Sequence, residues 1–135
     1  MDKIVVSSCL AGIKCRYDGT CKKDEYVSSL VEKGIAVPMC PEVLGGLSTP
    51  REPSEIVGDK VLTKSGRDVT KNYYDGANMV LDYCKKHNIK KVIFKDKSPS
   101  CGKCIYDGTF SGKLINKPGI TTALLLENNI KVEVR

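Results

Sequence analysis

Three cysteines each follow a short apolar run of the sequence. Cys9 comes after residues 3–8 and Cys40 after residues 34–39, while Cys101 follows residues 91–95 and a Ser-Pro-Ser turn. If the three runs are parallel strands of one sheet, their thiols lie at its carboxyl edge, where open α/β sheets build binding sites. Three thiolates that are distant in sequence and close in space suit a metal ion or an iron–sulfur cluster.

Four polar residues accompany these thiols. Glu42 stands two residues after Cys40, where its carboxylate either serves as a general base beside a metal centre or braces the loop through hydrogen bonds. Ser98 and Ser100 bring hydroxyl groups to the third loop, and Arg51 is a candidate for holding an anionic group. These residue types predict a site that both binds a ligand and moves protons.

A second thiol in the third loop opens a competing interpretation. Cys101 and Cys104 form a C-x-x-C motif, which alone indicates zinc or dithiol redox chemistry. The sequence has no second C-x-x-C, so the zinc-ribbon hypothesis fails, and a dithiol enzyme would depend on Cys104 as much as on Cys101. The single histidine, His87, ends a lysine-rich helix and is predicted at the surface, which argues against histidine catalysis.

One short motif occurs twice. Residues 15–20 read Cys-Arg-Tyr-Asp-Gly-Thr, and residues 104–109 read Cys-Ile-Tyr-Asp-Gly-Thr. Each Tyr-Asp-Gly-Thr predicts a tight turn in which Asp bonds its own backbone and Gly takes a positive φ. Two such turns in cysteine-bearing loops indicate that the loops border one site; the alternative is two independent turns.

Hydrophobic periodicity predicts the elements that position these residues. We expect helices over 21–33, 69–87 and 121–128, strands over 3–8, 35–39, 91–95 and 130–134, and a hairpin of 55–57 with 60–63. The long loop over 96–118 is of a length that is usually functional. The order predicts one α/β domain over residues 1–135, with three layers, a mostly parallel Rossmann-like sheet, and the site at the carboxyl edge of its strands.

Composition limits the class of protein. No apolar stretch approaches the ~20 residues of a membrane span, and the N-terminal residues lack a signal-peptide pattern. We therefore expect a cytoplasmic protein, in which the seven cysteines serve metal binding or catalysis rather than disulfides. The net charge of +6 suits anionic partners such as nucleotides or RNA, but the absence of Trp and the presence of only two Phe argue against an aromatic surface for single-stranded RNA.

Longer motifs surround the three cysteines. They are Cys-Leu-Ala-Gly with a following Arg-Tyr-Asp-Gly, then Cys-Pro-Glu-Val-Leu-Gly-Gly-Leu with Thr-Pro-Arg, then Ser-Pro-Ser-Cys-Gly with Ile-Tyr-Asp-Gly-Thr-Phe-Ser-Gly. Together these motifs resemble those of the thiouracil desulfidase family. The likeness covers residues 3–130, and several motifs in the right order make it far more specific than any one of them.

This resemblance implies an oxygen-sensitive [4Fe–4S] cofactor held by Cys9, Cys40 and Cys101, with catalytic roles for Glu42 and Ser98. It implies thiolated uracil bases, nucleosides or nucleotides as substrates, such as 2-thiouracil, 4-thiouridine and 4-thio-UMP. In two-domain relatives it implies tRNA, which we favour less as a partner of this chain. The further cysteines of the repeated motif remain open as a fourth ligand or a disulfide of cluster-free protein.

The expected reaction is a non-redox hydrolysis. One iron without a protein ligand would act as a Lewis acid on the thiocarbonyl sulfur. Glu42 would activate water, Ser98 would position the water or relay a proton, and Ser100 and Arg51 would contact the substrate. The products are uracil species and hydrosulfide. The alternative is a zinc-thiolate hydrolase or an RNA-binding module that uses the same cysteines.

Overall fold

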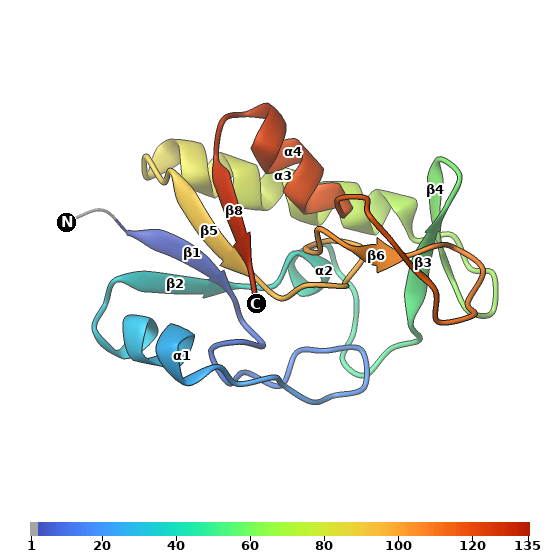
Figure 1. The fold of residues 1–135 in the computed structure, drawn as a ribbon, viewed down its shortest axis with the longest axis horizontal. Coiled ribbons are helices and arrows are strands. Elements are labelled where there is room, and N and C mark those ends of the chain that lie inside the picture. The colour runs from blue at the N-terminus through green and yellow to red at the C-terminus, as the bar shows by residue number, and fades with distance from the viewer. Residues whose placement is uncertain (1–2) are drawn as a thin grey trace.

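The fold is built on a four-stranded parallel sheet (Figure 1). The structure, a computed structural model, describes residues 3–135. The strands lie in the order β2-β1-β5-β8, and their bounds are β1 Ile4–Ser7, β2 Ala36–Met39, β5 Lys91–Phe94 and β8 Lys131–Val134. Each neighbouring pair is parallel, so the carboxyl ends of all four strands meet at one edge. The predicted parallel sheet is therefore confirmed.

Helices cover both faces of this sheet. Figure 1 shows α3 (Thr70–Lys86) and α4 (Ile120–Glu127) on one face and α1 (Glu25–Glu32) on the other. Adjacent residues of β1 point to opposite faces, since Val5 packs in the core cluster under α3 and α4, whereas Val6 packs with Val27 of α1. Both valines are fully buried, as in a sheet covered on its two sides. The predicted three-layer α/β class is confirmed; the finer label Rossmann-like stays a prediction.

Proline in the second strand is accommodated by its place in the sheet. Pro38 lies on β2, opposite Val6 of β1, and β2 is an edge strand of the sheet. An edge position suits a residue that has no N–H to donate to the ladder. β2 therefore carries Cys40 to the carboxyl edge although Pro38 lies within the strand.

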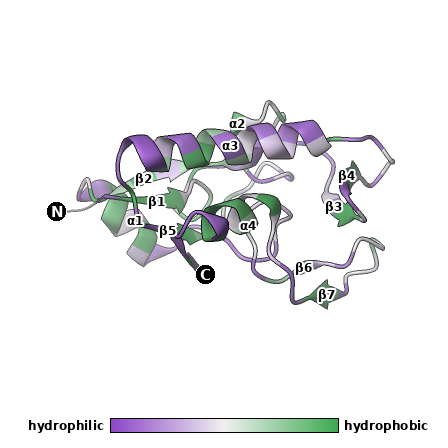
Figure 2. Ribbon diagram, turned by 90° about the horizontal axis from the view of Figure 1, so that it is seen from above, coloured by the Kyte–Doolittle hydropathy of each residue, from purple (hydrophilic) through white to green (hydrophobic). Residues whose placement is uncertain are grey.

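The longest helix has the buried stripe that its periodicity predicts. The buried residues of α3 include Tyr73, Ala77, Val80, Leu81 and Cys84. Gly76 lies between them because the helix closely approaches the segment after β2, and a Cβ at this position would collide with the carbonyl oxygen of Pro41. In the view of Figure 2, α3 alternates between hydrophilic and hydrophobic residues, whereas α4 is mainly hydrophobic.

The structure differs from the sequence prediction at the start of α1. The helix begins at Glu25 and not at residue 21, because the Asp24 side chain accepts a hydrogen bond from the Val27 backbone N–H at 3.0 Å. Such capping satisfies one of the free N–H groups of the first turn. Cys21 consequently lies in the connecting segment before the helix.

Short elements also occur in the segments expected to be loops. A one-turn helix, α2 (Pro41–Leu44), directly follows Cys40. The loop over 96–118 contains a small hairpin of β6 (Ile105–Tyr106) and β7 (Leu114–Ile115). The predicted hairpin of β3 (Ser54–Val57) and β4 (Lys60–Thr63) is confirmed. Across residues 3–135, none of the helices combines the length and apolarity that crossing a bilayer requires.

Candidate functional site

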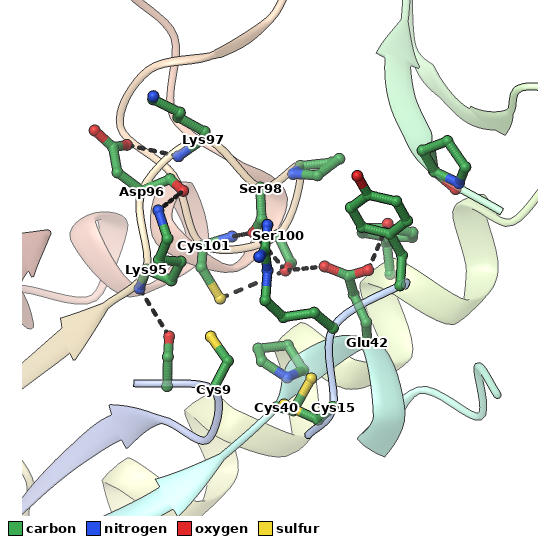
Figure 3. A pocket seen from close by; sticks show the side chains of 18 of the residues that line it. Cys9, Cys15, Cys40, Glu42, Lys95, Asp96, Lys97, Ser98, Ser100 and Cys101 are labelled. Carbon is green, nitrogen blue, oxygen red and sulfur yellow. Dashed lines mark hydrogen bonds between the residues drawn. The ribbon is translucent and has the colours of Figure 1, made fainter. Parts of the chain in front are cut away.

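The loops at the carboxyl edge of the sheet enclose a cavity of about 360 Å³. It is lined by the three cysteines expected at the edge and by a fourth that belongs to the repeated motif. Figure 3 shows Cys15 and Cys40 side by side, with the sulfurs of Cys9 and Cys101 directed toward the same space. The structure thus brings together every site residue that the sequence predicts: Cys9, Cys40, Glu42, Arg51, Ser98, Ser100 and Cys101.

The strand ends fix the first two cysteine loops relative to the third. Beyond the regular ladder, the Ser8 N–H donates to the Met39 carbonyl at 2.9 Å, directly before Cys9 and Cys40. The Lys95 N–H donates to the Ser7 hydroxyl at 2.9 Å, which ties the end of β5 to the end of β1. The thiols are therefore placed by the sheet itself.

The third loop is held by the beginning of α4. The backbone N–H groups of Thr121 and Thr122 donate to the Ser100 carbonyl at 2.9 and 3.1 Å. The Thr122 hydroxyl donates to the Cys101 carbonyl at 2.7 Å. The free N–H groups at a helix start need acceptors, and here the third loop supplies them, which anchors Ser100 and Cys101 to α4.

The four thiols form what we call the thiol side of the cavity, namely Cys9, Cys15, Cys40 and Cys101. A hydrogen bond with Cys15 raises the pKa of the Cys40 thiol, and burial raises it further. For Cys15, the hydrogen bond with Cys40 lowers the pKa, but the bond with Cys9 and burial outweigh it and raise the value to about 11. Burial raises the pKa of Cys101 to about 12. Without a metal the thiols of Cys15, Cys40 and Cys101 are therefore protonated at neutral pH.

The donor set of the thiol side fits an iron–sulfur cluster. Thiols from three different loops border one cavity, and thiolates are the ligands of such clusters. Across residues 3–135, no group of three or more His, Cys, Asp or Glu side chains is arranged to hold a metal ion. Each cysteine of a four-iron cluster binds a different iron, so its ligands need not converge on one point.

A hydrogen-bonded group centred on Glu42 faces the thiols. Its Oε1 accepts from the Tyr73 hydroxyl at 3.0 Å and from Nε and Nη2 of Arg51 at 3.3 and 3.0 Å. Its Oε2 accepts from the Ser100 hydroxyl at 2.9 Å. We call this group the oxygen side of the cavity; its members are Glu42, Arg51, Tyr73, Ser98 and Ser100. The contacts of Oε1 with Arg51 and Tyr73 are those expected of a residue that braces its loop, which is the alternative interpretation of Glu42.

Besides its bonds to Glu42, Arg51 connects two loops of the cavity. Its Nη1 donates to the carbonyls of Cys15 and Ser48 at 3.1 and 3.0 Å and to the Thr49 hydroxyl at 3.1 Å. The side chain is only 9% exposed, so its ion pair with Glu42 is mostly shielded from water. The guanidinium therefore joins the segment after β1 to the segment after β2.

The two predicted serines have different surroundings. Ser100 is buried, and its hydroxyl lies 2.9 Å from Glu42 Oε2 and 3.4 Å from the Cys101 sulfur. The Ser98 hydroxyl accepts from the Cys101 N–H at 2.8 Å and lies 3.1 Å from the Ser100 hydroxyl. Ser98, Ser100 and Glu42 thus form a continuous chain of hydrogen-bonding groups.

Positive charge borders the cavity beside Cys9. Burial lowers the pKa of Lys95, and the neighbouring charges of Arg16 and Lys97 lower it further. Asp96 stands between these lysines, and its Oδ1 accepts three backbone N–H groups of its own loop. Burial raises the pKa of Asp96, but these hydrogen bonds outweigh it and keep the value below the ordinary one.

The repeated motif forms two matching turns. Asp18 accepts from the N–H and hydroxyl of Thr20, and Asp107 accepts from those of Thr109. The glycines that follow the aspartates have φ of +78° and +92°. Tyr17 and Tyr106, the first residues of the two turns, both line the cavity. The prediction that these loops border one site is confirmed.

Other sequence expectations fall outside the cavity. Cys104 lies three residues from Cys101 but is not among the lining residues. Cys84 is a buried core residue, and His87 is exposed, both as predicted. Sequence reasoning did not assign Tyr73 to the site, and it left Cys15 open as a fourth ligand or a disulfide partner. The signal for Cys15 was its place before the repeated turn; for Tyr73, helical periodicity indicated only a buried face.

The loops at the carboxyl edge of a parallel sheet bring four thiols and a carboxylate to one cavity, an arrangement that suits a class of proteins with a thiolate-bound cofactor. The sequence model of the family described as 2-thiouracil desulfurase matches residues 4–135. The chain therefore belongs to the 2-thiouracil desulfurase family, which confirms the resemblance seen in its motifs.

Two individual proteins are similar over nearly their whole length. YbbK of Bacillus subtilis (strain 168), described as an uncharacterized protein, is 49% identical over 140 residues, which cover 96% of this chain and 93% of that protein. A solved structure described as the [4Fe–4S]-dependent thiouracil desulfidase TudS superposes with a TM-score of 0.95 at 43% identity, covering 100% of this chain and 91% of that one. The description of that enzyme agrees with the cofactor expected here.

Proposed function

We propose that this protein is a [4Fe–4S]-dependent desulfidase that removes sulfur from thiolated uracil bases or nucleotides, such as 2-thiouracil, 4-thiouridine and 4-thio-UMP. The observation that carries the proposal is the meeting of the cysteine thiols with Glu42 in one cavity. The family match and the similar solved structure support the same activity. The seven cysteines are free thiols, which suits the reducing cytoplasm that we propose as its location.

In this proposal Cys9, Cys40 and Cys101 hold the cluster. They come from the ends of three strands, and each faces the cavity. When bound, a cluster with three protein ligands supplies one open iron that acts as a Lewis acid toward a thiocarbonyl sulfur. Binding requires the three thiols to lose their protons, so the raised pKa values of Cys40 and Cys101 belong to the cluster-free protein.

The oxygen side carries out the proton transfer. A water molecule that attacks the thiocarbonyl carbon gives a proton to Glu42 Oε2 and forms the new C–O bond. The hydroxyl proton of the adduct then passes to sulfur, the C=O bond forms as the C–S bond breaks, and hydrosulfide leaves with the bonding electron pair. The proton on Glu42 returns to water, so no external oxidant or reductant is needed. Ser100 and Ser98 continue the hydrogen-bonded chain from Oε2, and we assign Ser98 the positioning of water or the relay of the proton.

Two residues are assigned to substrate binding. The Ser100 hydroxyl lies between Glu42 and the Cys101 sulfur, and therefore beside the reacting centre. Arg51 lines the same cavity and keeps a positive charge next to it. Because a small cavity of about 360 Å³ admits a base or nucleotide more readily than a folded RNA, we propose free thiolated pyrimidines as the substrate class.

The test is sulfide release by protein purified without oxygen and reconstituted with iron and sulfide. We expect hydrosulfide and uracil from 2-thiouracil, hydrosulfide and UMP from 4-thio-UMP, and neither reaction with Cys9→Ala protein. Thiolated tRNA serves as the third substrate. A stable cluster without release from any small molecule would contradict the substrate class, and bound zinc without inorganic sulfide would favour the zinc-thiolate alternative.

A further inference from the structure

Tyr73 presents a phenol to the polar part of the cavity from the otherwise apolar face of α3. Its side chain is 1% exposed, and its hydroxyl donates to Glu42 Oε1 at 3.0 Å. Burial and the negative charge of Glu42 raise the pKa of Tyr73 well above its ordinary value. The phenol therefore keeps its proton and acts as a permanent hydrogen-bond donor to the carboxylate.

The two oxygens of Glu42 have unequal surroundings. Oε1 accepts from the Tyr73 hydroxyl and from two nitrogens of Arg51. Within residues 3–135, Oε2 accepts one hydrogen bond, from the Ser100 hydroxyl. Since a carboxylate oxygen has about two lone pairs to offer, three donor nitrogens and oxygens fully occupy Oε1, and Oε2 is the oxygen with room for a further hydrogen bond.

The backbone fixes the distance between Glu42 and Tyr73. α2 and α3 touch through two glycines, because a Cβ at Gly45 would collide with the carbonyl of Asn72 and a Cβ at Gly76 with that of Pro41. The Asn72 side chain also donates to the Gly45 carbonyl at 2.8 Å. Such close packing leaves α2 little freedom to shift, so the phenol meets the carboxylate in one geometry.

We propose that Tyr73 is a positioning residue for the desulfidase reaction, which fixes Glu42 Oε1 so that Oε2 faces the attacking water. This inference rests on the proposed role of Glu42 as the base. Tyr73 itself does not touch the reacting atoms. The competing explanation is structural: the carboxylate would merely satisfy a buried hydroxyl.

The test compares Tyr73→Phe with Tyr74→Phe in cluster-loaded protein. The first change removes the hydroxyl and keeps the ring, whereas Tyr74, the next residue on α3, is 47% exposed and makes a matched control. For Tyr73→Phe we expect a normal iron and sulfide content, an unchanged KM for 2-thiouracil and a kcat lowered roughly tenfold, because a misdirected catalytic group slows the chemical step. Tyr74→Phe should match the wild type.

A double-mutant cycle distinguishes positioning from structure. In a Glu42→Gln background the Tyr73→Phe change should cost no further activity, since Tyr73 acts through the Glu42 carboxylate. An equal loss in both backgrounds, an unchanged kcat, or a higher KM with normal kcat would overturn the proposal. Tyr73→Met is the second variant; if both variants fail to fold or to load iron, the residue is structural. Lack of sulfide release by the wild type would instead refute the proposed function.

Discussion

The thiol side and the oxygen side of the cavity differ in whether the protein alone supplies the partners of their polar groups. On the oxygen side, Glu42 accepts four hydrogen bonds, from Arg51, Tyr73 and Ser100. On the thiol side, the Cys15 thiol has hydrogen bonds with the thiols of Cys40 and Cys9, and the pKa of Cys101 is raised to about 12. The carboxylate is therefore organised without a cofactor, whereas the raised pKa values of Cys15, Cys40 and Cys101 keep these thiols protonated until a metal displaces the protons.

With the proposed residue roles, this difference predicts that cofactor binding and proton transfer are separable properties of the site. Substitutions on the thiol side should remove the cluster and with it all activity. Substitutions on the oxygen side should slow the reaction while the cluster stays in place. Substitutions elsewhere in the scaffold should change stability alone.

The largest effect is expected within the C-x-x-C motif. Cys101→Ala should abolish cluster binding and sulfide release, because a three-thiolate site loses one ligand. Cys104→Ala should retain both, since Cys104 does not line the cavity. Iron content, acid-labile sulfide and hydrosulfide release measured on the two variants give the comparison. Equal losses in both would support a dithiol or four-thiolate site and contradict the assigned triad.

Thiol reactivity in cluster-free protein should show the next largest effect. The pKa of Cys101 is raised from 9.0 to about 12 by burial, so the reactive thiolate fraction below pH 9 falls about a thousandfold relative to an unfolded chain. Alkylation by iodoacetamide at pH 8, followed by peptide mass spectrometry, should be much slower at Cys101 in folded than in urea-unfolded protein. Similar rates would show that the thiol side is not organised without the cluster.

A smaller effect is expected for the buried serine of the oxygen side. Ser100→Ala removes the hydroxyl that contacts Glu42 Oε2 and leaves the loop anchored through its backbone. We expect sulfide release to fall by roughly tenfold to a hundredfold with the cluster intact, in the range typical of proton-transfer groups. Steady-state kinetics and the visible absorbance of the cluster measure the two properties, and a loss of absorbance together with activity would place Ser100 on the thiol side.

The smallest effect concerns the scaffold at α1. Asp24→Ala removes the cap at Val27 and the ion pair with Arg135, which should lower the free energy of unfolding by about 1 kcal/mol. The cap and Arg135 keep the pKa of Asp24 below its ordinary value, so this stabilisation is present above pH 3.8 and is lost as the pH falls below it. Urea unfolding at pH 7 and pH 3 measures it, with the exposed Asp82→Ala as control. Lower activity per cluster would contradict a purely stabilising role.

The sequence predicts the scaffold better than the contacts in the site. Apolar runs and their order establish the parallel strands, and the position of each cysteine after a strand predicts the meeting of Cys9, Cys40 and Cys101. The sequence does not predict the helix α2, because a segment of four residues that begins with proline is too short to show helical periodicity. Nor does the sequence predict the hydrogen bond of Tyr73 to Glu42, because periodicity identifies a buried face of a helix but not the partner of a hydroxyl on it. The repeated turn places the loop of Cys15 at the site, but no local pattern predicts that its thiol lies against those of Cys9 and Cys40.

The separation of the two sides is tested most directly by one paired measurement. Glu42→Gln and Cys40→Ala proteins are reconstituted without oxygen, and iron, acid-labile sulfide and hydrosulfide release from 2-thiouracil are measured on the same samples. We predict a full cluster and activity reduced at least a hundredfold for Glu42→Gln, and neither cluster nor activity for Cys40→Ala. A cluster lost in Glu42→Gln, or retained with activity in Cys40→Ala, would contradict the account.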